Sequence, residues 1–129
     1  DLVRAIAAKI EGPTVSVQYG PNSPQACSDA LVEAMCAASA ADGRRITTHL
    51  HETKQQLEWG DAKFREGFMQ HYDALGLFSE RFTGAHGVWL RPADVDLMAA
   101  RGASVAVNMS SNFRLRSGIA PIGQYIASG

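Results

Sequence analysis

The chain has 129 residues, the size of a single domain, which is long enough to bury about two-thirds of its unfolded surface. Its 12 lysine and arginine residues nearly balance its 13 aspartate and glutamate residues, so the net charge of -1 gives no electrostatic basis for binding nucleic acid or an anionic membrane. No apolar run approaches the roughly 20 residues that span a bilayer, so we expect a cytoplasmic protein whose partners are small molecules or other proteins.

The first third of the chain predicts two helices and one strand. Residues 1–12 form a helical pattern, and the β-branched run VSVQY at residues 15–19 predicts the first strand. A polar loop then leads into a helix over residues 29–41, for which Ser28 is a suitable N-cap and Gly43 a suitable stop.

The same order of strand, loop and helix follows three more times. Further strands are predicted over residues 45–50, 82–90 and 103–108. The second strand is followed by a long loop and a helix capped by Asp61, whose predicted buried stripe comprises Phe64, Phe68, Tyr72 and Leu75. Pro92 begins the next helix, which ends at Gly102, and a last helix starts near Pro121.

Strands that alternate with helices indicate an α/β fold with a parallel sheet and right-handed connections. The chain contains no linker or low-complexity stretch, so residues 1–129 are expected to belong to one domain. Four such units suit either a small open sheet or half of an eight-unit (β/α) barrel.

Polar residues gather where the predicted strands end, which is where parallel α/β folds place their reactive groups. They are Asn22, Ser23, His49, His51, Glu52, His86, Asn108, Ser110, Ser111 and Asn112. A single histidine there is usually a satisfied core residue, but three of them beside a carboxylate, in neighbouring units, indicate a site.

The spacing within His49-Leu50-His51-Glu52 depends on where the strand ends. Strand alternation places the two imidazoles on one face and Glu52 on the other, so Glu52 joins His49 only if the chain bends near His51. An imidazole is a good ligand for zinc or iron, and a nearby carboxylate can transfer protons. Taken alone, the pattern H-x-x-E is weakly specific.

Three motifs in order, THLHETKQQ, GAHGVWL and ASVAVNMSSNFRLRSGIAPI, resemble the metal-dependent amidohydrolase superfamily. The resemblance is to the branch of cytosine, guanine and S-adenosylhomocysteine deaminases and triazine hydrolases. It covers roughly residues 14–129 and implies that the four strands are barrel strands four to seven. The expected fold is therefore a partial TIM-type (β/α) barrel with about four parallel strands, each followed by a helix.

The resemblance implies roles for individual residues. His49 matches the metal-binding histidine of strand five, Glu52 the acid that shuttles protons, and His86 the strand-six histidine that helps deprotonate the attacking water. Met109 replaces a proline common in that family, and Asn22 stands where many relatives have a substrate-binding histidine. Candidate substrate-binding residues are Asn22, His51, Trp59, Asn108, Ser111 and Asn112, although Trp59 also suits a packing role.

The family's remaining metal ligands have no counterpart in this sequence. An H-x-H pair at strand one and an aspartate at strand eight complete its site, whereas this chain supplies one matching ligand, His49. We therefore expect part of a catalytic barrel, with zinc or iron as cofactor in the complete enzyme and no metal necessarily bound by this chain alone.

The resulting hypothesis is a metal-dependent hydrolase that acts on a C–N bond of a small heterocyclic substrate. The alternative, from another class, is a non-catalytic α/β structural or interaction module. Since partial barrels expose sheet edges and apolar inner faces, we also expect a homo-oligomer.

Overall fold

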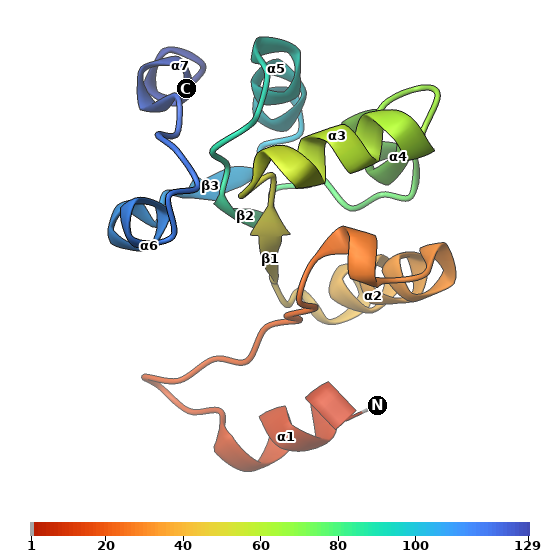
Figure 1. Cartoon of the computed structure of the whole chain (residues 1–129). Helices are drawn as coiled ribbons and strands as arrows, with labels where there is room; N and C mark the ends of the chain where they lie inside the picture. The colour runs from red at the N-terminus through yellow and green to blue at the C-terminus, as the bar shows by residue number, and fades with distance from the viewer. Residues whose placement is uncertain (1) are drawn as a thin grey trace.

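The computed structural model describes residues 2–129, which form a three-stranded parallel sheet with helices arranged beside it (Figure 1). The strands β1 (Ile46–Leu50), β2 (Phe82–His86) and β3 (Ser104–Ala106) lie side by side in chain order. The helices, including the single 3-10 turn η1, are α1 (Leu2–Ile10), η1 (Pro24–Ala26), α2 (Asp29–Asp42), α3 (Lys54–Lys63), α4 (Phe68–Ala74), α5 (Pro92–Ala100), α6 (Met109–Arg114) and α7 (Ile122–Ala127). The predicted α/β class with a parallel sheet is confirmed.

The predicted first strand, residues 15–19, is reduced to one bridge. Tyr19 pairs in parallel with Ile46. The N–H of Tyr19 donates to the carbonyl of Arg45 (2.9 Å), and the carbonyl of Tyr19 accepts the N–H of Thr47 (2.8 Å). The His49 N–H donates to the carbonyl of Asn22 at 3.2 Å. The segment thus runs alongside β1 in the parallel direction expected of the predicted first strand. It does not form a continuous ladder of hydrogen bonds with β1.

Several helix ends lie where the sequence places them. Ser28 caps α2 by accepting a hydrogen bond from the N–H of Leu31, and Gly43 ends it in the left-handed conformation with φ of 72°. Pro92 is the first residue of α5. These signals work because each satisfies or avoids an unpaired backbone group at a helix end.

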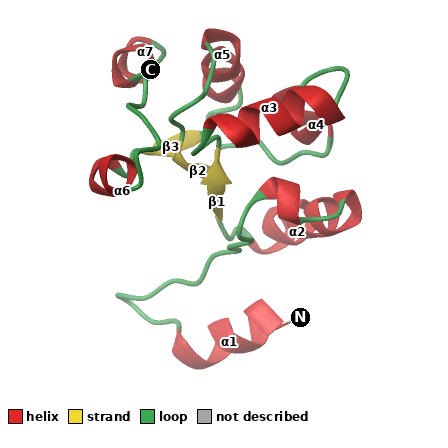
Figure 2. Cartoon of the chain, viewed as in Figure 1, coloured by secondary structure: helices red, strands yellow, loops and turns green. Residues whose placement is uncertain are grey.

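The prediction for residues 53–75 is wrong in its boundaries. Asp61 lies inside α3 and does not cap a helix, because the helix already begins after Thr53. Thr53 and Gln56 form a capping box, and Gly67, with φ of 103°, separates α3 from α4. Of the predicted apolar stripe, Phe68 and Tyr72 lie in α4, whereas Phe64 and Leu75 are the C-cap residues of α3 and α4. The cartoon coloured by secondary structure shows these two helices (Figure 2).

The core fills the space between one face of the sheet and the helices α2, α4 and α5. Ile46, Leu50 and Phe82 on that face are at most 1% exposed. They pack with Val32, Met35, Phe68, Met69, Tyr72, Val95 and Met98 from the helices. Because successive strand residues point to opposite faces, Thr47, His49, Thr83 and Ala85 lie on the other face and are only partly buried.

No helix among residues 2–129 combines the length and the apolar character that crossing a bilayer would require.

Gly84, in the central strand, is a position where the close packing of the sheet can be tested. A Cβ added there would lie 2.7 Å from Cδ2 and 3.1 Å from Cβ of Leu50. We expect Gly84→Ala to lower the free energy of unfolding by about 1–3 kcal/mol, the usual cost of overpacking a core. Urea unfolding measures the change. Gly123→Ala is the matched control, since a Cβ at Gly123 meets no atom within 4 Å, and equal stability of both variants would contradict the packing described.

Candidate active site

The site begins with His49 at the carboxyl end of β1. Its ring Nδ1 lies 2.6 Å from the backbone carbonyl of Asn22, in the segment beside β1. Since a carbonyl can only accept a hydrogen bond, Nδ1 must donate. The Nε2 of the neutral ring is then unprotonated, and this arrangement is the usual way in which a metal-binding histidine is oriented.

His86 lies on the neighbouring strand, at the end of β2. Alternation along β2 places its side chain on the core face with Phe82 and Gly84, but its φ of 77° breaks that alternation. Its ring centroid lies 5.3 Å from that of His49, and its Nδ1 lies 2.7 Å from Oδ1 of Asn112 on α6. The left-handed backbone therefore brings the two imidazoles together.

Glu52 reaches the same place because the chain turns immediately after β1. The strand ends at Leu50, His51 takes a left-handed φ of 43°, and the Glu52 N–H donates to Oε1 of Gln56 at 2.6 Å. The carboxylate Oε1 of Glu52 lies 3.8 Å from Nε2 of His86. The bend predicted near His51 is thus present, and it joins Glu52 to the histidine pair.

His51 points away from these groups, into the core. It is 2% exposed, and its ring centroid lies 4.7 Å from that of Phe68 on α4. Burial lowers the pKa of His51, a shift that the Asp94 carboxylate and the backbone of Trp89 oppose only in part. Neither ring nitrogen of His51 has a partner at the distance and angle of a hydrogen bond within residues 2–129. Its place beside Phe68 differs from that of the residues gathered around His86.

The polar ring of His51 should cost stability, because a buried polar group without a regular partner costs about 1–3 kcal/mol. His51→Leu and His51→Gln both have to adopt the left-handed backbone of this position, with φ of 43°, so they share its cost and differ in the polarity of the buried side chain. We therefore expect His51→Leu to have the higher free energy of unfolding in urea, by about 1 kcal/mol. Equal stability of the two variants, or a more stable His51→Gln, would show that this position offers hydrogen-bond partners to a polar side chain.

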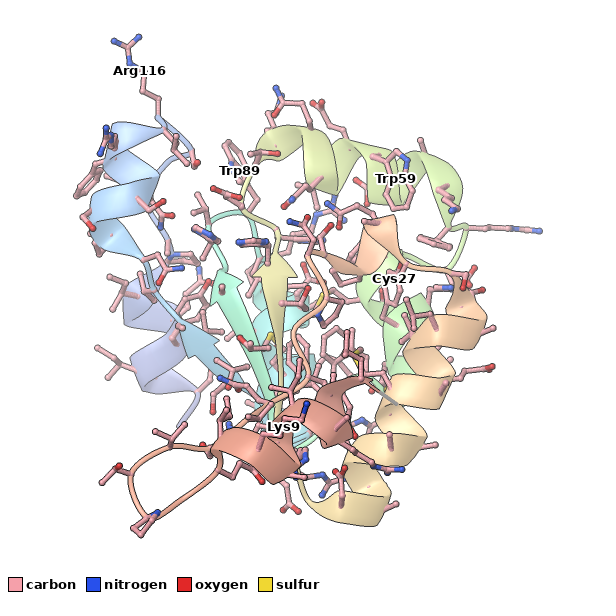
Figure 3. All side chains as sticks on the ribbon, turned by 90° about the horizontal axis from the view of Figure 1, so that it is seen from below. Lys9, Cys27, Trp59, Trp89 and Arg116 are labelled. Carbon is pink, nitrogen blue, oxygen red and sulfur yellow. The ribbon has the colours of Figure 1, made fainter. Side chains whose placement is uncertain are left out.

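The remaining candidate residues lie on α3 and at or within α6. Trp59 is on α3 (Figure 3). The residue is 36% exposed, and its ring lies edge-on to that of Phe64. Asn108 immediately precedes α6, and Ser111 is a half-buried residue within that helix. Asn112 is fully buried against His86. The contacts thus unite Asn22, His49, Glu52, His86 and Asn112.

A shallow hollow opens beside His49. It has a volume of about 400 Å³ and is lined by Gly20, Pro21, Asn22, Thr47, Thr48, His49 and Ala85. That volume falls in the range of small-molecule pockets. The hollow lies on the open face of the sheet, so an imidazole and polar backbone groups are accessible to a small ligand there.

Metal binding by this chain is limited to a partial set of ligands. Among residues 2–129, no three histidine, cysteine, aspartate or glutamate side chains are grouped so that they could hold a metal ion. The oriented Nε2 of His49 has the chemistry of one zinc or iron ligand, and zinc sites generally need three or four. The arrangement therefore fits a contribution to a metal site and does not constitute a complete one.

Gln56 is a residue that the motifs did not single out. Its side-chain oxygen accepts the N–H of Glu52 while its own N–H donates to Oγ1 of Thr53 at 3.3 Å. The pattern T-x-x-Q is a recognised sign of a capping box. It was therefore readable in the sequence, and it fixes both the start of α3 and the backbone of Glu52.

Comparison with known proteins defines the class. An adenosine deaminase from Xanthomonas campestris with bound zinc superposes on 98% of this chain with a TM-score of 0.91 and 26% identity, and the match covers 29% of that protein. The three parallel strands and their helices thus match part of a (β/α) barrel, which confirms the predicted fold.

The chain belongs to the amidohydrolase family, whose model matches residues 1–129. It is 29% identical over 120 residues to a 5-methylthioadenosine/S-adenosylhomocysteine deaminase of Thermococcus sibiricus, covering 93% of this chain and 28% of that protein. It is 30% identical over 129 residues to a 5'-deoxyadenosine deaminase of Methanococcoides burtonii, covering 100% of this chain and 30% of that protein. The chain therefore spans less than a third of these relatives, and the resemblance seen in the sequence is confirmed.

Proposed function

We propose that this chain forms part of the catalytic barrel of a metal-dependent deaminase that hydrolyses a C–N bond of an adenosine-type or related heterocyclic substrate. The observation that carries the proposal is the convergence of Glu52, His86 and His49 at the carboxyl ends of two adjacent parallel strands. Relatives that act on S-adenosylhomocysteine and 5'-deoxyadenosine support the choice of substrate class.

The three side chains have distinct roles in this proposal. His49 provides one metal ligand through Nε2, and its ring is held by the Asn22 carbonyl. A bound divalent metal acts as a Lewis acid and makes water a stronger nucleophile near neutral pH. His86 accepts a proton from the attacking water and passes it to the Glu52 carboxylate, which delivers it to the nitrogen that leaves as ammonia, and this is general acid–base catalysis. The spacing of 3.8 Å between Glu52 and His86 suits two groups that serve the same reacting centre.

The substrate class can be tested on the product of the whole reading frame that contains this segment. Ammonia release should be measured with adenosine, 5'-deoxyadenosine, S-adenosylhomocysteine, guanine and cytosine in parallel. Preference for the adenine nucleosides supports the proposal in full. Release only from guanine or cytosine would correct the substrate class, and release from none of them by the metal-loaded protein would overturn the proposed reaction.

The alternative hypothesis is that the isolated chain is a non-catalytic module. The incomplete group of ligands within residues 2–129 favours this hypothesis for the chain by itself. Metal analysis of the purified chain distinguishes the two. One equivalent of tightly held zinc would show that the chain completes a metal site by itself, for example by assembly of several copies. Three further statements stay predictions: the chain forms a homo-oligomer, the metal of the complete enzyme is zinc or iron, and the protein is cytoplasmic.

A further inference from the structure

Asn112 is completely buried, and among residues 2–129 its side chain makes one hydrogen bond, which joins two elements distant in sequence. It lies on α6 with 0% exposure, and its Oδ1 is 2.7 Å from Nδ1 of His86, which is itself 4% exposed. Its amide nitrogen Nδ2 has no hydrogen-bond partner within the described chain. A buried amide with one unpaired group costs stability. The hydrogen bond to His86 is therefore the polar interaction that best accounts for an asparagine at this position.

The fold of α6 does not depend on this amide side chain. The N–H of Asn112 donates to the carbonyl of Asn108 at 2.9 Å, and its carbonyl accepts the N–H of Ser117 at 2.9 Å. Both of its backbone groups are therefore paired locally. Replacing the amide by an apolar side chain of similar size therefore removes neither of these two backbone hydrogen bonds.

We propose that Asn112 is a positioning residue that holds the neutral ring of His86 in the Nδ1–H tautomer. A neutral imidazole has one nitrogen that donates and one that accepts. Because Oδ1 of Asn112 only accepts, Nδ1 carries the proton and Nε2 carries the lone pair. The tautomer of His86 does not depend on the proposed function. Its consequence rests on that function: Nε2 is available to accept a proton from the attacking water.

Glu52 is too far away to set the tautomer instead. Its Oε1 lies 3.8 Å from Nε2 of His86, beyond the length of a direct hydrogen bond. Among residues 2–129, the amide of Asn112 is therefore the group within hydrogen-bond distance of the His86 ring that can orient it. His49 is held in the same way through Nδ1, by the Asn22 carbonyl, so both rings present Nε2 as the free acceptor.

The tautomer can be observed directly in the 129-residue chain. Long-range proton–nitrogen correlation spectra of ¹⁵N-histidine-labelled protein, recorded at a pH where the rings are neutral, distinguish Nδ1–H from Nε2–H. His86→Asn, which tolerates the left-handed backbone at this position, identifies the signals of His86. We expect Nδ1–H in the wild type, the same tautomer in Asn112→Asp, and a fall of about ten-fold in the ratio of Nδ1–H to Nε2–H in Asn112→Leu.

His49 is the internal control, because a backbone carbonyl fixes its tautomer in every variant. Two results would overturn the proposal: Nε2–H for His86 in the wild type, which requires the amide to be turned so that Nδ2 donates, or an unchanged ratio in Asn112→Leu. If the leucine variant does not fold, the wild-type and Asn112→Asp spectra still decide between the two tautomers. None of these measurements depends on turnover, so a failure here is distinct from a failure of the proposed reaction.

Discussion

Glu52→Gln in the complete enzyme is expected to lower turnover by about 100-fold or more, because general acid–base catalysis contributes about 10² to 10⁴. Glutamine has the same shape and cannot deliver the proton in the same way. The backbone of Glu52 is held by Gln56 at 2.6 Å, so the substitution should leave the geometry intact. Steady-state kinetics gives the turnover, and elemental analysis should show an unchanged metal content.

Glu58→Gln is the matched control for this experiment. Glu58 lies on α3, its side chain is 58% exposed, and it pairs with Lys54 on the surface. The same change of charge there should leave turnover near normal. Normal turnover by Glu52→Gln would remove Glu52 from the mechanism, and loss of metal in that variant would instead point to a role as a ligand.

His49→Ala in the complete enzyme is expected to lose metal. Even removal of a group that only orients a ligand costs about 10- to 100-fold in metal affinity, so removal of the ligand itself should cost more. Activity should fall together with metal content, and both should be measured on the same preparation after dialysis against a chelator. Full metal content in the alanine variant would show that His49 is not a ligand.

His71→Gln is the control for the loss of an imidazole. His71 lies on α4, stacked on Phe64 and within 3.1 Å of Asp29, with no part in the cluster around His86. It should keep the metal. Equal metal loss in both variants would mean that the effect arises from general destabilisation of the fold.

The order of elements was predictable because it depends on local signals. Ser28, Gly43 and Pro92 each act on backbone groups next to them, and the structure confirms all three positions. The failure at Asp61 has the same origin, since a capping residue was identified without the stronger capping box at Thr53 and Gln56 being recognised. Where two start signals compete, the one with reciprocal hydrogen bonds determines the helix start.

The site was only partly predictable because it depends on backbone conformation. The sequence placed His49, Glu52 and His86 at neighbouring strand ends, and the parallel register brings those ends together. It could not show that His51 turns into the core beside Phe68, because alternation predicts the same face for His49 and His51. It also could not reveal the Asn22 carbonyl, a backbone atom without a sequence signature, as the partner of His49.

The strand β2 ends at a left-handed histidine and β1 is followed by one, and this restricts which residue types can replace His51 and His86. His51 and His86 have φ values of 43° and 77°, a region that asparagine, aspartate, histidine and glycine enter more readily than other residues. Valine, isoleucine and threonine are excluded on backbone grounds alone. A library designed to alter specificity should therefore vary side chains elsewhere around the hollow and admit at these two positions only residues that tolerate the turn.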